Sequence, residues 1–205
     1  MMRKLLCVLM LLCLLSTAAA EDFGRTYKSF EACYAENIVF INENTGRHLL
    51  PHTPTRDYDS KGNRLYRIQS GALSVEIHLD DLAEQIASCQ IMLTAPENLK
   101  YGTSQHHDFN TAGYHSYALI MAMDMSATPY ERYALVNRIN EGLAASGADP
   151  FQTQVGDYRL TCTSLNGVAT MLFENELLME SEPLPPIEDE EIPEEETSEE
   201  DAFLG

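Results

Sequence analysis

The chain has 205 residues, of which 32 are Asp or Glu and 13 are Lys or Arg, so its formal net charge is −19. An acidic surface repels nucleic-acid phosphates and anionic lipid headgroups, which excludes nucleic acid as a partner and disfavours binding to a membrane surface. About 160 residues remain between an apolar N-terminal leader and an acidic C-terminal tail, and that length suits one domain with a single hydrophobic core.

The first 20 residues predict a signal peptide. Arg3 and Lys4 precede an apolar stretch over residues 5–15, and the segment ends in three alanines. A basic start, a short apolar run and small residues at the end are typical of export signals, and this apolar run is too short for a permanent membrane span. We therefore expect an exported protein, secreted or periplasmic, with no stable membrane insertion after signal cleavage.

Residues 21–180 are expected to form the single globular domain, which opens with a helix. Apolar side chains recur at helical spacing over residues 27–41, with Thr26 in front as a cap and Gly46 beyond. The apolar run at residues 38–41 also fits a short strand, which leaves the end of this helix open.

A polar stretch with several Pro and Gly residues follows the helix. Within it, Asp57 and Asp59 imitate the opening of a calcium-binding loop, but Lys61 and Ile68 stand where such a loop requires oxygen ligands. We therefore expect no calcium site. Residues 59–63 are predicted to form a turn that leads into a strand.

Five strands are predicted from hydrophobic alternation and turn signals, at residues 64–69, 73–80, 85–94, 158–164 and 168–174. The second of them alternates strictly between apolar and polar side chains, which is the pattern of a half-buried strand. The last two flank Asn166 and Gly167, a dipeptide that strongly favours a two-residue hairpin turn.

Two helices are predicted between the strands. Asn110 is a favoured N-cap for the first, and Phe109 before it can pack onto Tyr114. In the second, over residues 128–145, Glu131 completes a capping box, and the short connection between the two predicts a helical hairpin. The order of elements indicates the α+β class: an antiparallel sheet of about five strands, with the N-terminal helix and the helical hairpin packed on one face.

One cluster of chemically capable side chains lies in residues 104–117, which read SQHHDFNTAGYHSY. His106, Asp108 and His115 could supply three zinc ligands and leave a fourth position for water, as in a zinc-dependent hydrolase. The entrance of a helix explains the same residues without a metal, and signatures such as H-E-x-x-H are absent from the sequence. We therefore expect no metal and no cofactor here.

The expected function is that of an exported, non-catalytic binding or accessory domain. The predicted helices and strands account for the chemically capable side chains, so no group of residues remains that would indicate catalysis. The partner is a protein or a small molecule, and the sequence does not distinguish between them. The alternative is a zinc-dependent hydrolase built on His106, Asp108 and His115. Tyr114, Tyr117, Tyr130 and Tyr133 could line a binding groove, but at helical spacing we interpret them as core.

Three cysteines follow the signal peptide, and each is in register with apolar neighbours: Cys33, Cys89 and Cys162. They are therefore expected to be buried, unreactive thiols. Because Cys89 and Cys162 both lie on predicted strands, they are the candidate pair if an exported protein oxidises one.

Residues 181–205 hold eleven acidic residues, several prolines and no Lys or Arg. Dense like charge with little apolar surface to bury predicts a disordered tail that keeps the domain solvated.

Overall fold

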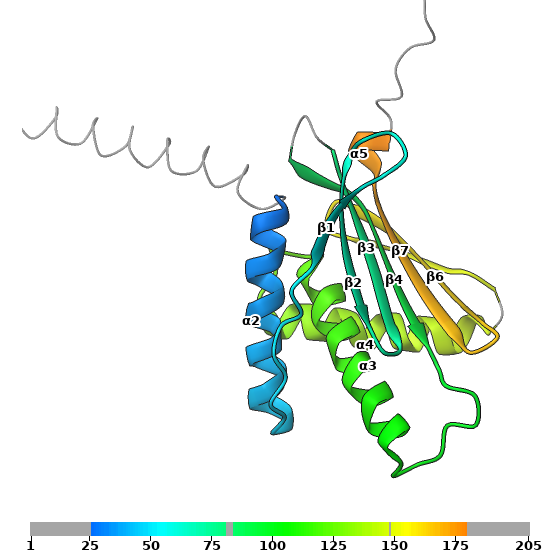
Figure 1. Ribbon diagram of the computed structural model, residues 1–205. Coiled ribbons are helices and arrows are strands. Elements are labelled where there is room, and N and C mark those ends of the chain that lie inside the picture. The colour runs from blue at the N-terminus through cyan, green and yellow to red at the C-terminus, as the bar shows by residue number, and fades with distance from the viewer. Residues whose placement is uncertain (1–25, 81–83, 148, 180–205) are drawn as a thin grey trace, which may run out of the picture.

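The structure is a computed structural model that describes residues 26–80, 84–147 and 149–179 (Figure 1). The predicted signal peptide and the acidic tail lie outside the described residues.

The strands form one antiparallel sheet in the order β1-β2-β3-β4-β7-β6-β5 (Figure 1). A four-strand meander and a three-strand meander meet in the middle of the sheet, where β4 pairs with β7. The strands are β1 (Thr55–Tyr58), β2 (Arg64–Ser70), β3 (Leu73–Asp80), β4 (Gln85–Thr94), β5 (Phe151–Val155), β6 (Tyr158–Leu165) and β7 (Val168–Asn175).

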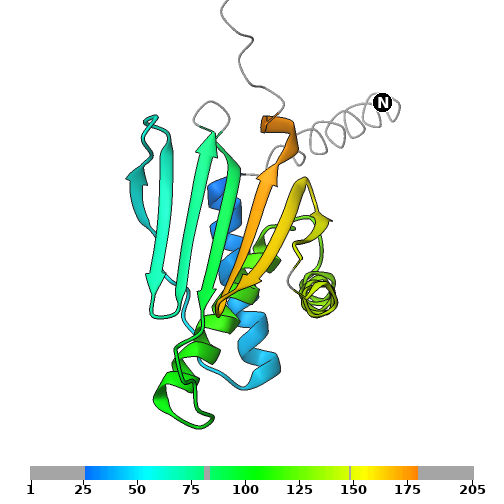
Figure 2. The same ribbon diagram turned by 90° about the vertical axis from the view of Figure 1, so that its right-hand side faces the viewer.

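Three long helices lie on one face of this sheet, as Figures 1 and 2 show from two sides. They are α2 (Tyr27–Thr45), α3 (Ser104–Ala122) and α4 (Pro129–Ser146), and a short α5 (Glu176–Met179) follows β7. Helix α3 contacts β3 and β4, α4 contacts β5 and β6, and α2 packs chiefly on α3. The predicted α+β class is therefore confirmed.

The sheet has seven strands, so the expectation of about five was too low. The two missed strands are the edge strands, β1 with the sequence TRDY and β5 with the sequence FQTQV. Edge strands are often short and polar because one side of their backbone faces water. Strand β1 shows no apolar alternation, and β5 alternates over five residues only, so neither gives a pattern as long as those from which the other five were predicted. In β1 no residue is buried.

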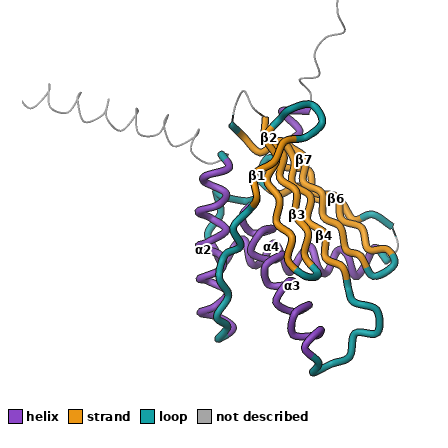
Figure 3. Tube along the Cα trace, in the orientation of Figure 1, coloured by secondary structure: helices purple, strands orange, loops and turns teal. Residues whose placement is uncertain are grey.

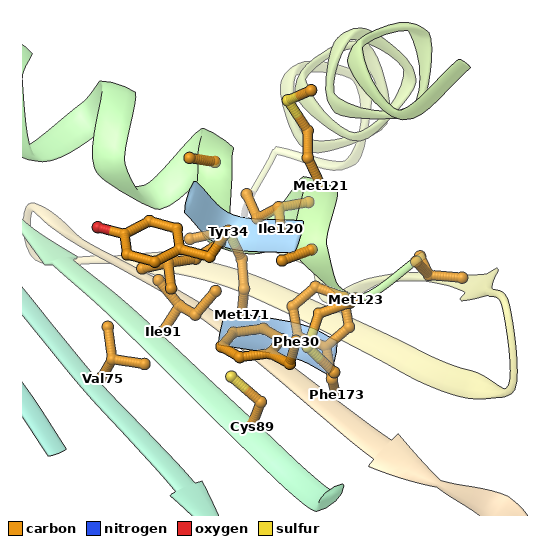
Figure 4. Close-up of a cluster of buried hydrophobic side chains, with 14 of the residues drawn as sticks. Phe30, Tyr34, Val75, Cys89, Ile91, Ile120, Met121, Met123, Met171 and Phe173 are labelled. Carbon is orange, nitrogen blue, oxygen red and sulfur yellow. The ribbon is translucent and has the colours of Figure 1, made fainter. Parts of the chain in front are cut away.

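Alternation along β3 explains how the sheet acquires its covered face. Leu73, Val75, Ile77 and Leu79 are buried, and the polar residues between them point to the other face. Aligned positions of β4 and β7 continue this apolar surface beneath the helices, with Cys89, Ile91, Met171 and Phe173 drawn in Figure 4. The core therefore lies between one sheet face and the helices.

Two predicted turns are confirmed in their details. The Asp59 carboxylate accepts hydrogen bonds from the N–H groups of Lys61 and Asn63, at 2.8 and 2.9 Å, and so closes the turn between β1 and β2. Asn166 and Gly167 have φ angles of 51° and 77°, which the β6–β7 hairpin requires of a two-residue turn of this kind.

Helix α2 begins where the sequence predicts and ends later. The Thr26 hydroxyl accepts the Ser29 N–H at 3.2 Å, and Gly46 ends the helix with a φ of 67°. The apolar run at residues 38–41 is helical, not a strand: Ile38 and Ile41 continue the buried stripe of α2, whereas Val39 between them is exposed.

Helix α3 begins seven residues earlier than predicted, so the assignment of Asn110 as its cap was wrong. Thr103 is the cap, and its hydroxyl accepts the His106 N–H at 3.3 Å. Asn110 lies inside the helix, where its side-chain amide is 3.3 Å from the His106 ring. Phe109 is likewise helical and does not precede the first turn.

Helix α4 runs across α3 instead of folding back along it, so the two do not form the expected antiparallel hairpin (Figures 1 and 2). The buried Arg132 side chain holds this corner. Its guanidinium donates to the carbonyl groups of Asp124 and Met125, at 2.8 and 3.0 Å, in the connection between the helices. It also donates to Glu36 and Asn37 of α2, at 2.8 and 3.2 Å, which ties the three helices together.

Within the described residues, none of the helices is both long enough and apolar enough to cross a membrane.

Candidate functional site

The structure does not bring the three candidate zinc ligands together. His106 and His115 lie on the same helix nine positions apart, which corresponds to roughly 13 Å along the helix axis. Asp108 is exposed, and His115 is only 3% exposed. Ligands of one zinc ion each lie about 2 Å from it, so a separation of this size prevents a shared site. Across residues 26–80, 84–147 and 149–179, no group of three or more His, Cys, Asp or Glu side chains could hold a metal ion.

His115 instead belongs to a buried polar contact. Its Nδ1 lies 2.9 Å from the Tyr34 hydroxyl, and its ring centroid is 4.1 Å from that of His52. Burial and the neighbouring His52 lower the pKa of His115 to about 4, and burial also lowers the pKa of His52. Both rings are therefore neutral near pH 7. No sequence pattern predicts this pair, because His52 comes from the loop before β1 and His115 from α3.

A groove of about 660 Å³ lies between the three long helices, and we call it the aromatic groove. Most of its lining comes from α2, α3 and α4, with one residue from β4: Phe40, Ile41, Asn44, Thr45, Leu93, Phe109, Asn110, Gly113, Tyr114, Tyr117, Tyr130 and Tyr133. Its volume falls within the roughly 300–1,000 Å³ that is usual for ligand pockets.

Aromatic rings from all three helices meet in the groove. The Phe40 ring of α2 is edge-on to Tyr130 of α4, with centroids 5.1 Å apart, and lies 6.1 Å from Tyr133. On α3, Tyr114 and Tyr117 also meet edge to face, at 6.3 Å. Such edge-to-face contacts stabilise the ring positions relative to one another.

The interpretation of the tyrosines as core was wrong for the two on α4, since Tyr130 is 73% exposed and Tyr133 is 44% exposed. On α3, Tyr114 and Tyr117 are half-buried and pack against the core, and they line the groove as well. The buried positions of α4 are instead Arg132, Leu135, Val136 and Ile139. Helical spacing alone does not separate these two stripes, because they are adjacent on one helix. Their separation depends on the angle at which α4 crosses α3.

The lining of the groove carries no formal charge. None of the described residues that line it is Lys, Arg, His, Asp or Glu, and its polar groups are amides and hydroxyls such as those of Asn44 and Thr45. One cation lies beside the lining, since the Arg47 guanidinium carbon is 4.2 Å from the Tyr114 ring centroid. The groove therefore offers ring faces and neutral hydrogen-bonding groups, which suit binding and supply no acid–base pair for catalysis.

The three cysteines of the described residues, Cys33, Cys89 and Cys162, are buried free thiols, as predicted. Cys89 lies on β4 and Cys162 on β6, and β7 runs between these strands. Two strand spacings are about 9–10 Å, whereas a disulfide needs Cα atoms within about 7 Å, so the candidate pair cannot bridge. Burial raises the pKa of both thiols to about 12, which keeps them protonated and unreactive.

Comparison of the chain with protein-family models, with curated proteins and with solved structures gives no match. Its function is therefore inferred from the contacts of the described residues.

Proposed function

We propose that the chain is an exported, non-catalytic binding domain and that the aromatic groove holds its partner. The observation that carries this proposal is the gathering of six aromatic side chains from three helices around one open groove. Exposed apolar surface is unfavourable in water, so its concentration in a concave site favours a binding role. Tyr130 and Tyr133 are the most exposed of these rings and form the outer wall.

The partner we propose is a segment of another protein that brings a cationic side chain, with arginine as the best match. The strongly acidic chain, with its net charge of −19, attracts cations and repels anions. Aromatic ring faces attract cations, and they do so more strongly where water is displaced. The contact of Arg47 with Tyr114 is the chain's own example of a guanidinium on a ring of this groove.

Two short peptides test the partner chemistry. Both are acetylated and amidated and share the sequence Gly-Pro-X-Pro-Gly, where X is arginine in one and citrulline, its neutral isostere, in the other. Titration into the labelled domain is followed by NMR, which detects weak binding. We expect the arginine peptide to bind roughly two- to thirtyfold more tightly, the range that corresponds to a cation–π contact. Equal affinities would contradict a cationic partner.

Two variants test the location. Tyr133→Leu removes a ring of the groove and keeps apolar bulk, and it should weaken binding of the arginine peptide several-fold. Tyr101→Leu is the matched control, because Tyr101 is 92% exposed but lies outside the groove lining. An equal effect of the two substitutions would place the binding site elsewhere.

A further inference from the structure

The loop that follows α2 turns back and runs beside it before entering β1, as the teal segment next to α2 in Figure 3 shows. We call residues 47–52 of this loop the strap. At its start, Arg47 lies over the Tyr114 ring. In its middle, the Leu49 N–H donates to the Asn42 side-chain oxygen at 2.8 Å, and the Asn42 amide donates to the Leu49 carbonyl at 2.9 Å.

The far end of the strap is held by the buried histidine contact. The His52 N–H donates to the Tyr34 hydroxyl oxygen at 3.3 Å, and that hydroxyl lies 2.9 Å from Nδ1 of His115. Because the Tyr34 oxygen already accepts the His52 N–H, its own O–H is free to donate to Nδ1 of His115. This arrangement satisfies all three groups, and it requires an unprotonated Nδ1 and therefore a neutral His115. The His52 ring then packs against the His115 ring.

We propose that the strap is an acid-sensitive latch, closed at neutral pH and released when the His52–His115 pair takes up a proton. A proton on Nδ1 of His115 would reverse this hydrogen bond, so the Tyr34 oxygen would have to accept from both Nδ1–H and the His52 N–H, and the hydroxyl proton would lose its acceptor. A charge on either ring would lie beside a second imidazole, with centroids 4.1 Å apart. Movement of the half-buried His52 into water, backbone included, separates the two rings and lets solvent reach His115, and it breaks the contact of the His52 N–H with Tyr34.

Among the described residues, no negative charge beside the pair raises the pKa of either ring. From α2 the neighbour is the Tyr34 hydroxyl, and the core-facing side chains of β3 and β4 are aliphatic except for the Cys89 thiol. The guanidinium of Arg132 on α4 is taken up by Glu36 and Asn37. In the described part of the chain, no carboxylate bonds to either imidazole. Burial therefore lowers the pKa of both histidines.

Release of the strap would also act on the aromatic groove. Arg47 belongs to the strap, so its departure frees one face of the Tyr114 ring. This link to ligand binding rests on the proposed function, whereas the latch itself does not. Acidification would then change the affinity of the groove without a change in its lining.

Amide exchange and NMR test the latch on the whole domain without any ligand. Between about pH 7 and about pH 4, protection factors at the Leu49 and His52 N–H groups should fall at least about tenfold more than those of the β3 and β4 amides, which report the loss of global stability. The ring-current shift that Tyr114 imposes on the Arg47 side-chain protons should vanish over the same range. Unchanged protection at Leu49 and His52 would overturn the latch, and unchanged Arg47 shifts would overturn its link to the groove.

Three glutamine variants identify the groups that titrate. His115→Gln and His52→Gln should each flatten the pH dependence, because glutamine takes up no proton. His48→Gln is the matched control, since His48 is exposed on the same strap, and it should behave as the wild type. His52→Gln alters a loop residue and remains informative if the buried substitution disturbs folding. Loss of the response in His48→Gln, or its survival in His52→Gln, would overturn the assignment.

The amide-exchange and Arg47 shift measurements need no ligand. They therefore test the latch even if the arginine peptide does not bind to the groove.

Discussion

Arg132 shows how one side chain sets the packing of three helices. It is 5% exposed, and it donates four hydrogen bonds to groups of α2 and of the connection before α4. The capping box formed by Thr128 and Glu131 is visible in the sequence, but nothing in the local pattern marks Arg132 as buried. Its role depends on Glu36 and Asn37, which lie about a hundred positions earlier in the sequence, so no local pattern could reveal it.

Replacement of Arg132 by methionine keeps the apolar stem and removes the donors. We expect Arg132→Met to lower the free energy of unfolding by about 2–4 kcal/mol, because buried carbonyl groups and the Asn37 side chain lose their partner. Arg138→Met on the same helix is the control. Arg138 is exposed, so its loss should cost less than about 0.5 kcal/mol. Urea denaturation measures both, and similar costs would show that the Arg132 network does not stabilise the corner.

His115 should make stability depend on pH in a definite direction. Its folded-state pKa of about 4 lies below the ordinary value of 6.5, so the unfolded chain takes up the proton first as the pH falls. The stability contributed by neutral His115 is therefore fully present above about pH 6.5 and is lost as the pH falls towards about 4. We expect this loss to be about 1–3 kcal/mol, since one pKa unit corresponds to about 1.4 kcal/mol.

Urea denaturation of the wild type and of His115→Gln at about pH 7, 5.5 and 4.5 isolates this contribution. Carboxylates whose pKa values are lowered, such as Asp59 and Glu131, destabilise both proteins alike in acid. The wild type should lose more stability than the variant over this range. Parallel pH profiles would mean that His115 does not titrate differently in the folded and unfolded states.

At the scale of elements, prediction succeeded where the pattern is local. The strands β3 and β4 match their predicted ranges because apolar alternation and Pro96 define them. The edge strands β1 and β5 were missed because they are short and largely polar: β1 has no apolar alternation, and that of β5 covers five residues only. The start of α3 was misplaced because Asn110 is a strong cap by residue type, whereas Thr103 has no Glu or Gln three positions later to complete a capping box.

Two substitutions test whether Thr103 or Asn110 caps α3. Thr103→Ala should cost about 1 kcal/mol, because it removes the hydroxyl that accepts the His106 N–H. Asn110→Ala should cost less than about 0.5 kcal/mol, since alanine is the better residue in a helix interior and only a long contact with the His106 ring is lost. Thermal or urea denaturation compares the two. The opposite order would restore Asn110 as the cap.

At the scale of the whole molecule, one sheet face is covered by helices, and the groove lies where those helices do not fully cover one another. The sequence identified four of its tyrosines as candidate groove residues but favoured the core for them. Whether a tyrosine on α4 is core or groove depends on the crossing of α4 over α3, which long-range contacts such as that of Arg132 determine. A binding domain could thus be proposed from the sequence, whereas the groove could be located only from the way the helices pack.

The central claim is that the aromatic groove is the surface that meets the partner, and mapping of chemical-shift changes tests it most directly. The labelled domain is titrated with the arginine peptide at about pH 7, and shifts are followed for backbone amides and aromatic ring protons. We expect the largest changes at Phe40, Tyr114, Tyr130 and Tyr133, because their rings line the groove. Changes concentrated on the uncovered face of the sheet, at residues such as Glu76 or Gln90, would contradict the account.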